Sequence, residues 1–149
     1  MTLIAPILLV EDSDLDAELT GAALAELRLA NPIVRLRDGV EALDYLASRG
    51  AYAERAPGHP VVVLLDLKMP RVDGLEVLSW IRADPTWRQL PVVMLTSSRE
   101  ERDLVRSYEL GANAFVVKPV DGEQFTEAVR AIGAFWALIN EPATGRGPG

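Results

Sequence analysis

Short apolar runs alternate along the chain with stretches in which apolar residues recur every third or fourth position. Four runs are continuously apolar and of strand length: Ile7–Val10, Val61–Leu65, Val92–Leu95 and Ala114–Val117. Such unbroken runs are expected for parallel strands that are covered on both faces. A fifth run, Ile33–Arg37, alternates apolar and polar residues, which favours the edge of a sheet.

Helical patterns fill the segments between these runs. The first helix is predicted from four apolar residues that are spaced four apart on one face: Leu15, Leu19, Ala23 and Leu27. A short second helix covers residues 41–48, and capping-box spacing begins three further helices at Asp73, Ser98 and Asp121. Gly111 should end the fourth helix. The fifth presents one apolar face: Phe125, Val129, Ile132 and Trp136.

This order, a strand followed by a helix five times over, predicts an α/β fold with a doubly wound parallel sheet and right-handed crossovers. The length of 149 residues suits one domain, which we expect at residues 1–140. Residues 141–149 are expected to form a flexible C-terminal tail. Ligands of such sheets bind beyond the carboxyl ends of the strands, so the residues that follow each strand decide the chemistry.

Composition removes several classes of function. The chain has no cysteine, which excludes disulfides and thiolate chemistry and fits a cytoplasmic location. The net charge of −7 opposes binding to nucleic acid or to an anionic membrane. No apolar run is long enough to span a bilayer, and the first residues lack the basic head of a signal peptide.

Chemically active side chains follow four of the predicted strands. Glu11 and Asp12 follow the first, Asp66 the third, Thr96 the fourth and Lys118 the fifth. An acid after a strand is commonly a helix cap, and a lone lysine is usually a surface group. Because the carboxyl ends of parallel strands share one edge of the sheet, we expect all five side chains to converge there.

Three carboxylates and one ammonium leave this cluster with two negative charges. Like charges about 4 Å apart cost on the order of 4 kcal/mol at an effective dielectric of 20, so the cluster should retain protons or bind a divalent cation. Oxygen ligands alone favour Mg²⁺. A carboxylate held beside Mg²⁺ and a lysine is suited to attack a phosphoryl group, which predicts an acyl phosphate on Asp66.

Two other interpretations of the acidic segments fail on their own requirements. The "DSDLD" stretch resembles the start of an EF-hand, but that loop needs glycine and glutamate where Ala17 and Ala23 stand. Asp14 and Asp16 are therefore expected to favour the start of the first helix. A phosphatase of the D-x-D type needs a second aspartate two positions after Asp66, where this chain has Lys68.

These residues resemble the receiver domain of two-component response regulators. The resemblance covers about residues 5–140 and includes "LLVEDSDLDAELT", "DGVEAL", "LLDLKMPRVDGLEVL", "VVMLTSS" and "LGANAFVVKPV". It implies a flavodoxin-like, CheY-like (βα)5 three-layer sandwich with strand order 2-1-3-4-5. The segments "RDGVEALDYL", "RGAYAERAPGHP" and "WALINEP" further resemble single-domain regulators that pair with bacterial phytochrome-type histidine kinases.

The resemblance also implies a role for each matching position. Asp66 would accept the phosphoryl group, Lys118 would bind it, and the bond between Lys118 and Pro119 would be cis. Mg²⁺ would be held by four groups: Glu11, Asp12, Asp66 and the backbone carbonyl of Lys68. Thr96 and Phe115 would be the switch pair, with phenylalanine standing where many receivers have tyrosine.

The expected function is that of a stand-alone phosphoryl-accepting switch, with no enzymatic activity beyond self-phosphorylation and autodephosphorylation. Its donor would be a sensor histidine kinase or a phosphotransfer protein. Phosphorylation would change the side of the domain formed by the fourth helix, the fifth strand and the fifth helix. The alternative is a pseudo-receiver that is never phosphorylated and acts only as a protein-interaction scaffold.

The end of the fifth helix carries more apolar residues than one core-facing stripe requires: Phe135, Trp136, Leu138 and Ile139. They either cap the core and lie singly exposed, or form a patch for a homodimer or partner, which we favour. Tyr108 on the fourth helix either joins this interface or is a half-buried core residue.

Overall fold

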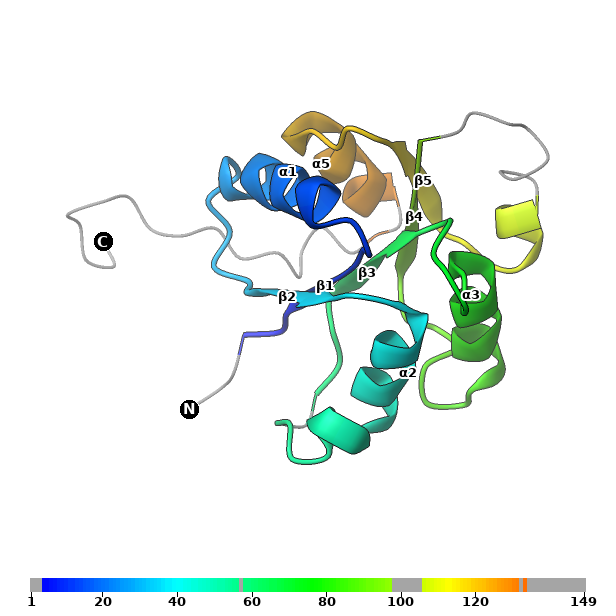
Figure 1. Cartoon of the computed structure of the whole chain (residues 1–149). Coiled ribbons are helices and arrows are strands. Elements are labelled where there is room, and N and C mark those ends of the chain that lie inside the picture. The colour runs from blue at the N-terminus through cyan, green and yellow to red at the C-terminus, as the bar shows by residue number, and fades with distance from the viewer. Residues whose placement is uncertain (1–3, 57, 98–105, 132, 134–149) are drawn as a thin grey trace.

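The structure, a computed structural model, describes residues 4–56, 58–97, 106–131 and 133 (Figure 1). Strands and helices alternate along these residues, in the order β1 (Ile7–Val10), α1 (Asp14–Ala25), β2 (Ile33–Leu36), α2 (Gly39–Ala47), the 3-10 turn η1 (Gly50–Tyr52), β3 (Val62–Asp66), α3 (Gly74–Ala83), β4 (Val92–Thr96), β5 (Ala114–Val117) and α5 (Gly122–Ala131). Residues 106–109 form a helical turn before β5. The predicted alternation of strands and helices is confirmed.

All five strands are parallel and lie in the order β2-β1-β3-β4-β5. Helices α1 and α5 cover one face of the sheet, and α2 and α3 cover the other (Figure 1). The three-layer sandwich with strand order 2-1-3-4-5 is therefore confirmed. Because the strands run in the same direction, their carboxyl ends lie along one edge of the sheet.

The sheet has an apolar core on each face, which explains why its strands are continuously apolar. In β1, Leu8 and Val10 pack on the side of α2 and α3, whereas Ile7 and Leu9 pack on the side of α1 and α5. All four side chains are at most 1% exposed. β2 lies at the edge as predicted, with its first residue, Ile33, exposed.

The predicted helix starts agree with the described residues in most cases. Asp73 and Glu76 form a complete capping box at the start of α3, with Glu76 N donating to Asp73 Oδ1 at 2.9 Å. Asp121 Oδ1 accepts a hydrogen bond from Gln124 N at 2.7 Å at the start of α5. α2 begins at Gly39, two residues before the predicted position, because Asp38 is its cap. Ser98 lies outside the described residues.

The predicted apolar face of α1 is wrong at its first two positions, whereas Leu27, just after the helix, is half-buried against the core on that side of the sheet. Leu15 and Leu19 are 64% and 49% exposed, and the helix instead buries Ala17, Thr20 and Leu24 against the sheet. Two stripes with helical spacing compete on this helix, and the one made largely of small side chains lies against the sheet. The rotation of α1 about its axis consequently directs its first-turn acids toward the carboxyl edge and toward β2.

Arg82, at the end of α3, ties together segments at the amino end of β4 and β5. Its Nε donates to the carbonyl oxygen of Gly111 at 2.8 Å, and its Nη2 donates to Asn113 Oδ1 at 2.7 Å. Its Nη1 donates to the carbonyl oxygens of Arg88 and Leu90. Gly111 follows the helical turn 106–109 with a φ of 101°, in agreement with the predicted helix end.

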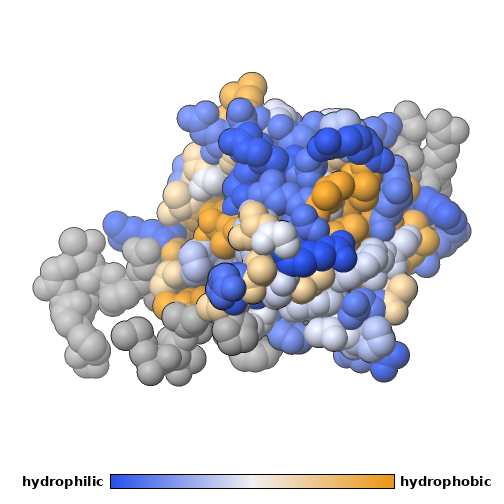
Figure 2. All heavy atoms as spheres, turned by 60° about the horizontal axis from the view of Figure 1, so that its bottom comes forward, coloured by the Kyte–Doolittle hydropathy of each residue, from blue (hydrophilic) through white to orange (hydrophobic). Residues whose placement is uncertain are grey.

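Exposed large apolar side chains occur on several elements among the described residues, including Leu15 and Leu19 on α1, Ile33 on β2 and Val40 on α2. Figure 2 shows one face, on which hydrophobic spheres lie among hydrophilic ones. Among the described residues, no helix combines the length and the apolar character needed to span a bilayer. The predicted domain boundary at residue 140 and the tail 141–149 lie outside the described residues.

Candidate functional site

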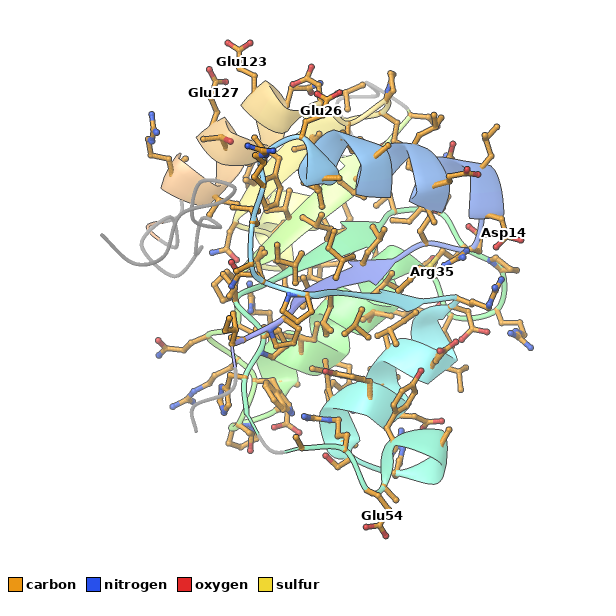
Figure 3. All side chains as sticks on the ribbon, turned by 90° about the vertical axis from the view of Figure 1, so that its left-hand side faces the viewer. Asp14, Glu26, Arg35, Glu54, Glu123 and Glu127 are labelled. Atoms are coloured by element: carbon orange, nitrogen blue, oxygen red, sulfur yellow. The ribbon has the colours of Figure 1, made fainter. Side chains whose placement is uncertain are left out.

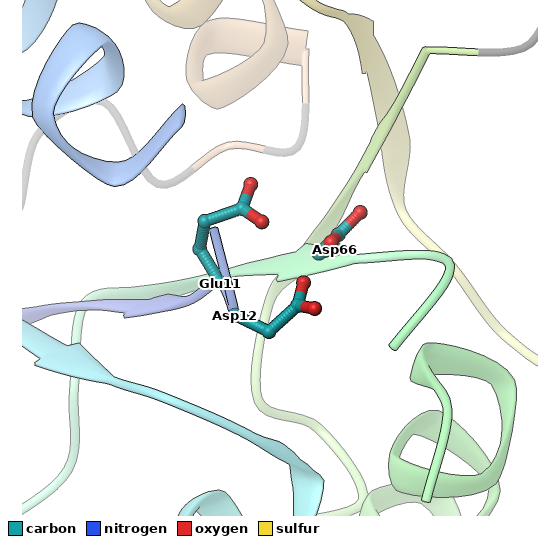
Figure 4. A group of neighbouring side chains, drawn as sticks. All are labelled: Glu11, Asp12 and Asp66. Atoms are coloured by element: carbon teal, nitrogen blue, oxygen red, sulfur yellow. The ribbon is translucent and has the colours of Figure 1, made fainter. Parts of the chain in front are cut away.

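Three carboxylates gather at the carboxyl ends of β1 and β3. Glu11 and Asp12 directly follow β1, and Asp66 is the last residue of β3 (Figure 4). One oxygen from each side chain lies within 4.8 Å of the others. Glu11 is fully buried and Asp66 is 6% exposed, whereas Asp12 is open to solvent. The predicted convergence of these acids is confirmed by the geometry.

The ammonium of Lys118 lies among these acids. Its Nζ is 2.6 Å from Glu11 Oε1 and 3.3 Å from Asp66 Oδ1. A third carboxylate, that of Asp16 on α1, accepts a hydrogen bond from Nζ at 3.1 Å. The Lys118 side chain is only 13% exposed, so its charge is compensated by side chains more than by water. The peptide bond between Lys118 and Pro119 is cis, as the resemblance implied.

The surroundings of these two groups raise the pKa of both, which favours the neutral form of Asp66 and the charged form of Lys118. Burial, reinforced by Glu11, raises the pKa of Asp66 to about 7, although the nearby ammonium of Lys118 opposes this change. Burial alone would lower the pKa of Lys118, but Glu11 and Asp66 outweigh burial and raise it. Near neutral pH, Lys118 is charged and a large fraction of Asp66 holds a proton.

Arg35 on β2 holds the segment that carries Glu11 and Asp12. Its Nε and Nη2 donate to the carbonyl oxygen of Glu11 at 2.9 and 2.7 Å. Its Nη1 donates to Asp14 Oδ1 at 2.9 Å, at the start of α1 (Figure 3). Arg37 also pairs with Asp14, but its side chain is 64% exposed. Arg35 thus links the edge strand to the backbone from which two acids of the cluster project.

Gly74 allows α3 to begin directly beside Asp66. A Cβ atom at position 74 would lie 2.2 Å from the carbonyl oxygen of Asp66 and 3.0 Å from Leu67 Cα. These neighbours are backbone atoms, so they cannot move aside without displacing the end of β3. The absence of a side chain at Gly74 is therefore part of what positions Asp66.

The other predicted site residues lie on β4, on β5 and directly after β3, with Thr96 at the carboxyl end of its strand and Phe115 nearer the amino end of its own. Thr96 ends β4, one residue beyond Leu95, which pairs with Asp66 on β3, and it is 2% exposed. Phe115 on β5 pairs with Met94, two residues before Thr96 on the same face of the strand. Its ring is half-buried and meets the exposed ring of Tyr108 edge-on, with 4.8 Å between centroids. Lys68 is exposed in the segment after β3.

The donor set fits a hard divalent cation. It consists of carboxylate oxygens, which Mg²⁺ and similar cations prefer over nitrogen or sulfur. Glu11 Oε1 is buried near Lys118 Nζ, yet within the described parts of the chain it accepts no hydrogen bond of good geometry. A buried oxygen with this deficit and two neighbouring acids would gain from a cation.

Comparison with known families agrees with this geometry. The model of the response regulator receiver domain matches residues 7–130. The chain belongs to the response regulator receiver family. The match covers every strand and helix described above except the last residue of α5, and it includes the acids, Thr96 and Lys118.

Individual relatives lie close to this receiver in sequence and structure. It is 39% identical to the response regulator Rcp1 of Synechocystis over 130 residues, 87% of each chain. The solved bacteriophytochrome response regulator AtBRR is 61% identical with a TM-score of 0.86, covering 94% of this chain and 100% of its own. The phosphorylated cyanobacterial phytochrome response regulator RcpA is 40% identical, with a TM-score of 0.73 and coverage of 90% and 94%. Rcp1 has also been solved in an Mn²⁺-bound form, with 38% identity, a TM-score of 0.72 and coverage of 93% and 99%.

Sequence reasoning did not identify three residues that build the receiver's site: Asp16, Arg35 and Gly74. The aspartate was assigned to the start of α1, and its bond to Lys118 joins positions 102 apart. The alternation within β2 could have indicated the arginine, and the glycine stands directly after the capping aspartate of α3. Their contacts depend on tertiary packing that no local pattern specifies.

The predicted interface can be examined at only one position. Tyr108 is 55% exposed, so the alternative of a half-buried core residue is wrong for this side chain. The four other predicted interface residues, Phe135, Trp136, Leu138 and Ile139, lie outside the described residues. Phe125 and Val129 of the predicted α5 face are buried as expected.

Proposed function

We propose that this receiver accepts a phosphoryl group on Asp66 from a histidine kinase in a Mg²⁺-dependent reaction. The observation that carries the proposal is the buried Asp66 carboxylate, which lies beside two other acids and 3.3 Å from the ammonium of Lys118. A carboxylate in these surroundings is a nucleophile with charge-stabilising groups already in position.

Glu11, Asp12 and Asp66, with the backbone carbonyl of Lys68, would hold the Mg²⁺ ion. The all-oxygen donors and the deficit at the buried Glu11 oxygen support this assignment. When bound, the ion would neutralise negative charge that develops on the phosphoryl oxygens. The Mn²⁺-bound form of the relative Rcp1 agrees with a divalent cation in this family.

In the transfer step, an Asp66 carboxylate oxygen attacks the phosphorus of a phosphohistidine. A new O–P bond forms, the P–N bond breaks, and its electron pair remains on the imidazole nitrogen. The product is an acyl phosphate. Lys118 supplies an ammonium to the phosphoryl oxygens, and the Thr96 hydroxyl donates a hydrogen bond to one of them. In the reset step, water attacks the phosphorus, the O–P bond to Asp66 breaks, inorganic phosphate leaves and the Asp66 carboxylate is restored.

Thr96 and Phe115 form the switch pair of this proposal. Thr96 and Phe115 lie on the same face of the sheet, so movement of Thr96 toward the phosphoryl group would leave space into which the Phe115 ring can turn. Because the ring of Phe115 contacts Tyr108, its inward rotation removes a packing partner from the exposed tyrosine. The surface of residues 106–110, β5 and α5, here called the switch face, then differs between the two states.

The partners follow from the family and from its relatives. A histidine kinase or a phosphotransfer protein donates the phosphoryl group, and similarity to the bacteriophytochrome regulator AtBRR favours a phytochrome-type kinase. Homodimerisation through the switch face is proposed on the exposed Tyr108 and the apolar residues predicted for the end of the fifth helix. The alternative is a scaffold that is never phosphorylated, for which clustered acids have no use.

Incubation with acetyl phosphate and Mg²⁺, followed by intact-mass spectrometry, tests the proposal. We expect a species heavier by one phosphoryl group, which does not form when EDTA is present from the start and is absent from Asp66→Asn. Asp44→Asn, an acid on α2 that pairs with Arg49 away from the cluster, is the matched control and should be phosphorylated normally. No uptake by the wild type from acetyl phosphate or phosphoramidate would favour the scaffold.

A further inference from the structure

Lys118 shares its charge among three carboxylates, one of which is outside the acid cluster. An ammonium has three N–H donors, no acceptor and a single positive charge. Glu11 and Asp66 contact it as ion-pair partners, and Asp16 also accepts a hydrogen bond from it. Glu11 and Asp66 belong to the cluster in which a cation and a phosphoryl group are proposed. Asp16 does not, although its Oδ2 accepts a hydrogen bond from Lys118 Nζ at 3.1 Å.

Asp16 is not needed as a local cap of α1. Its backbone N–H donates to Ser13 Oγ at 3.1 Å, which caps the helix. An acid at this third helical position commonly accepts a hydrogen bond from the N–H of the cap residue. Here the Ser13 N–H donates to Glu11 Oε2 instead, at 3.3 Å. The Asp16 carboxylate therefore extends across to Lys118.

The two partners nearest to Lys118 differ in how easily they can leave it. Glu11 has no exposed surface, whereas the Asp16 side chain is 39% exposed. A cavity of about 270 Å³, lined by Asp16, Leu19, Ser97 and Lys118 among others, lies beside the pair. Asp16 has room to turn toward water, and solvent makes its ion pair the weaker of the two.

A phosphoryl group on Asp66 would change this balance. It replaces about one negative charge by about two and brings three acceptor oxygens next to Lys118 Nζ. Those oxygens and the Asp16 carboxylate then compete for the same donors. The carboxylate also repels the additional negative charge. Both effects disfavour the phosphorylated state for as long as Asp16 remains charged and in place.

We propose that Asp16 is a positioning residue that holds Lys118 in the resting site and competes with the phosphoryl group for its ammonium. The inference rests on the phosphoacceptor function proposed above. It assigns Asp16 to the regulation of phosphoryl affinity: the receiver without this carboxylate binds a phosphoryl group more tightly and releases it more slowly.

The first test measures the affinity for beryllofluoride, a mimic of the acyl phosphate, in the presence of Mg²⁺ by NMR titration. Asp16→Asn keeps the size of the side chain and removes its charge, and we expect about three- to tenfold tighter binding. Asp14→Asn is the matched control, because it removes the same charge from the same helical turn but faces Arg35 and Arg37. Its affinity should stay within about twofold of the wild type.

Two outcomes separate this inference from the proposed function. If wild type and Asp16→Asn bind beryllofluoride equally, or the variant binds more weakly, the competition is overturned while phosphoacceptance stands. If the wild type binds none, the proposed function is overturned and this inference with it. Asp16→Glu, which restores the charge, should return the affinity toward that of the wild type.

A second readout follows the ammonium itself in the metal-free protein. The chain contains only two lysines, Lys68 and Lys118, so the side-chain ¹⁵N spectrum of lysine ammonium groups is simple to assign. Hydrogen exchange at Lys118 Nζ should be faster in Asp16→Asn than in the wild type, and unchanged in Asp14→Asn. Equal exchange in all three proteins would contradict the assignment, because a purely structural role of Asp16 does not protect Nζ.

Discussion

Lowering the pH from 8 to 6 should weaken Mg²⁺ binding by about tenfold. The pKa of Asp66 in the metal-free protein is raised to about 7, chiefly by burial and by Glu11. The ionised fraction of such a group is about 0.9 at pH 8 and about 0.1 at pH 6, and the cation binds the ionised form. A carboxyl with the ordinary pKa of 3.8 would remain ionised over this range and give a constant affinity.

The raised pKa of Asp66 also makes the unfolding free energy of the metal-free protein depend on pH. Because the folded-state pKa of Asp66 lies above its unfolded value of 3.8, the folded protein binds the proton more tightly than the unfolded chain. The resulting stabilisation is fully present below about pH 4 and is lost as the pH rises through about 7. The loss amounts to at most about 4 kcal/mol, from 1.36 kcal/mol per pKa unit. Metal-free Asp66→Asn should therefore be more stable than the wild type at pH 8. The difference in unfolding free energy between the two proteins should be smaller at pH 5.

Isothermal titration calorimetry with Mg²⁺ at pH 6, 7 and 8 measures the first effect. Urea unfolding in EDTA at pH 5 and pH 8 measures the second. In Asp66→Asn the remaining Mg²⁺ affinity should lose its dependence on pH between 6 and 8. A wild-type affinity that is constant over this range would refute the reasoning, because Asp66 would then be ionised throughout.

Three further predictions concern residues around the site. Gly74→Ala places a methyl group 2.2 Å from a backbone oxygen, so it should lower the unfolding free energy by about 1–3 kcal/mol and weaken Mg²⁺ binding in calorimetry. Gly21 lies in open space on α1, so the control variant Gly21→Ala should instead raise the unfolding free energy by up to about 1 kcal/mol. Arg35→Met leaves a carbonyl oxygen without its two donors and should cost about 1–3 kcal/mol in urea unfolding, whereas Arg37→Met should cost less than about 1 kcal/mol. Equal losses would contradict the positional role of the first arginine. Tyr108→Ala should weaken the proposed homodimer about tenfold or more in analytical ultracentrifugation, and an unchanged dimer constant would remove the tyrosine from the interface.

The sheet and the acid cluster were predictable because both depend on local signals. Each continuously apolar run marks a buried parallel strand, and a parallel sheet brings every carboxyl end to one edge. Glu11, Asp66 and Lys118 could therefore be grouped from their places after three strands. Their separations and their unequal burial could not, since these depend on how the loops close around the cluster.

The orientation of α1 was not predictable from periodicity. Leu15 and Leu19 have the spacing of a buried face, but so do Ala17, Thr20 and Leu24, and spacing alone does not choose between two stripes. Contacts with distant segments fix the choice, including the bond from Lys118 to the first turn of the helix. The same long-range contacts hid the role of Asp16.

The hydrogen bonds of Arg82 restrict where this molecule can change shape. They fasten the end of α3 to the chain before β4 and before β5, at the opposite end of these strands from Asp66. One guanidinium thus acts as an anchor at the base of the domain. The proposed movements of Thr96, Phe115 and Tyr108 would then take place about fixed points at Gly111 and Asn113, which stay bonded to the end of α3 while the receiver signals.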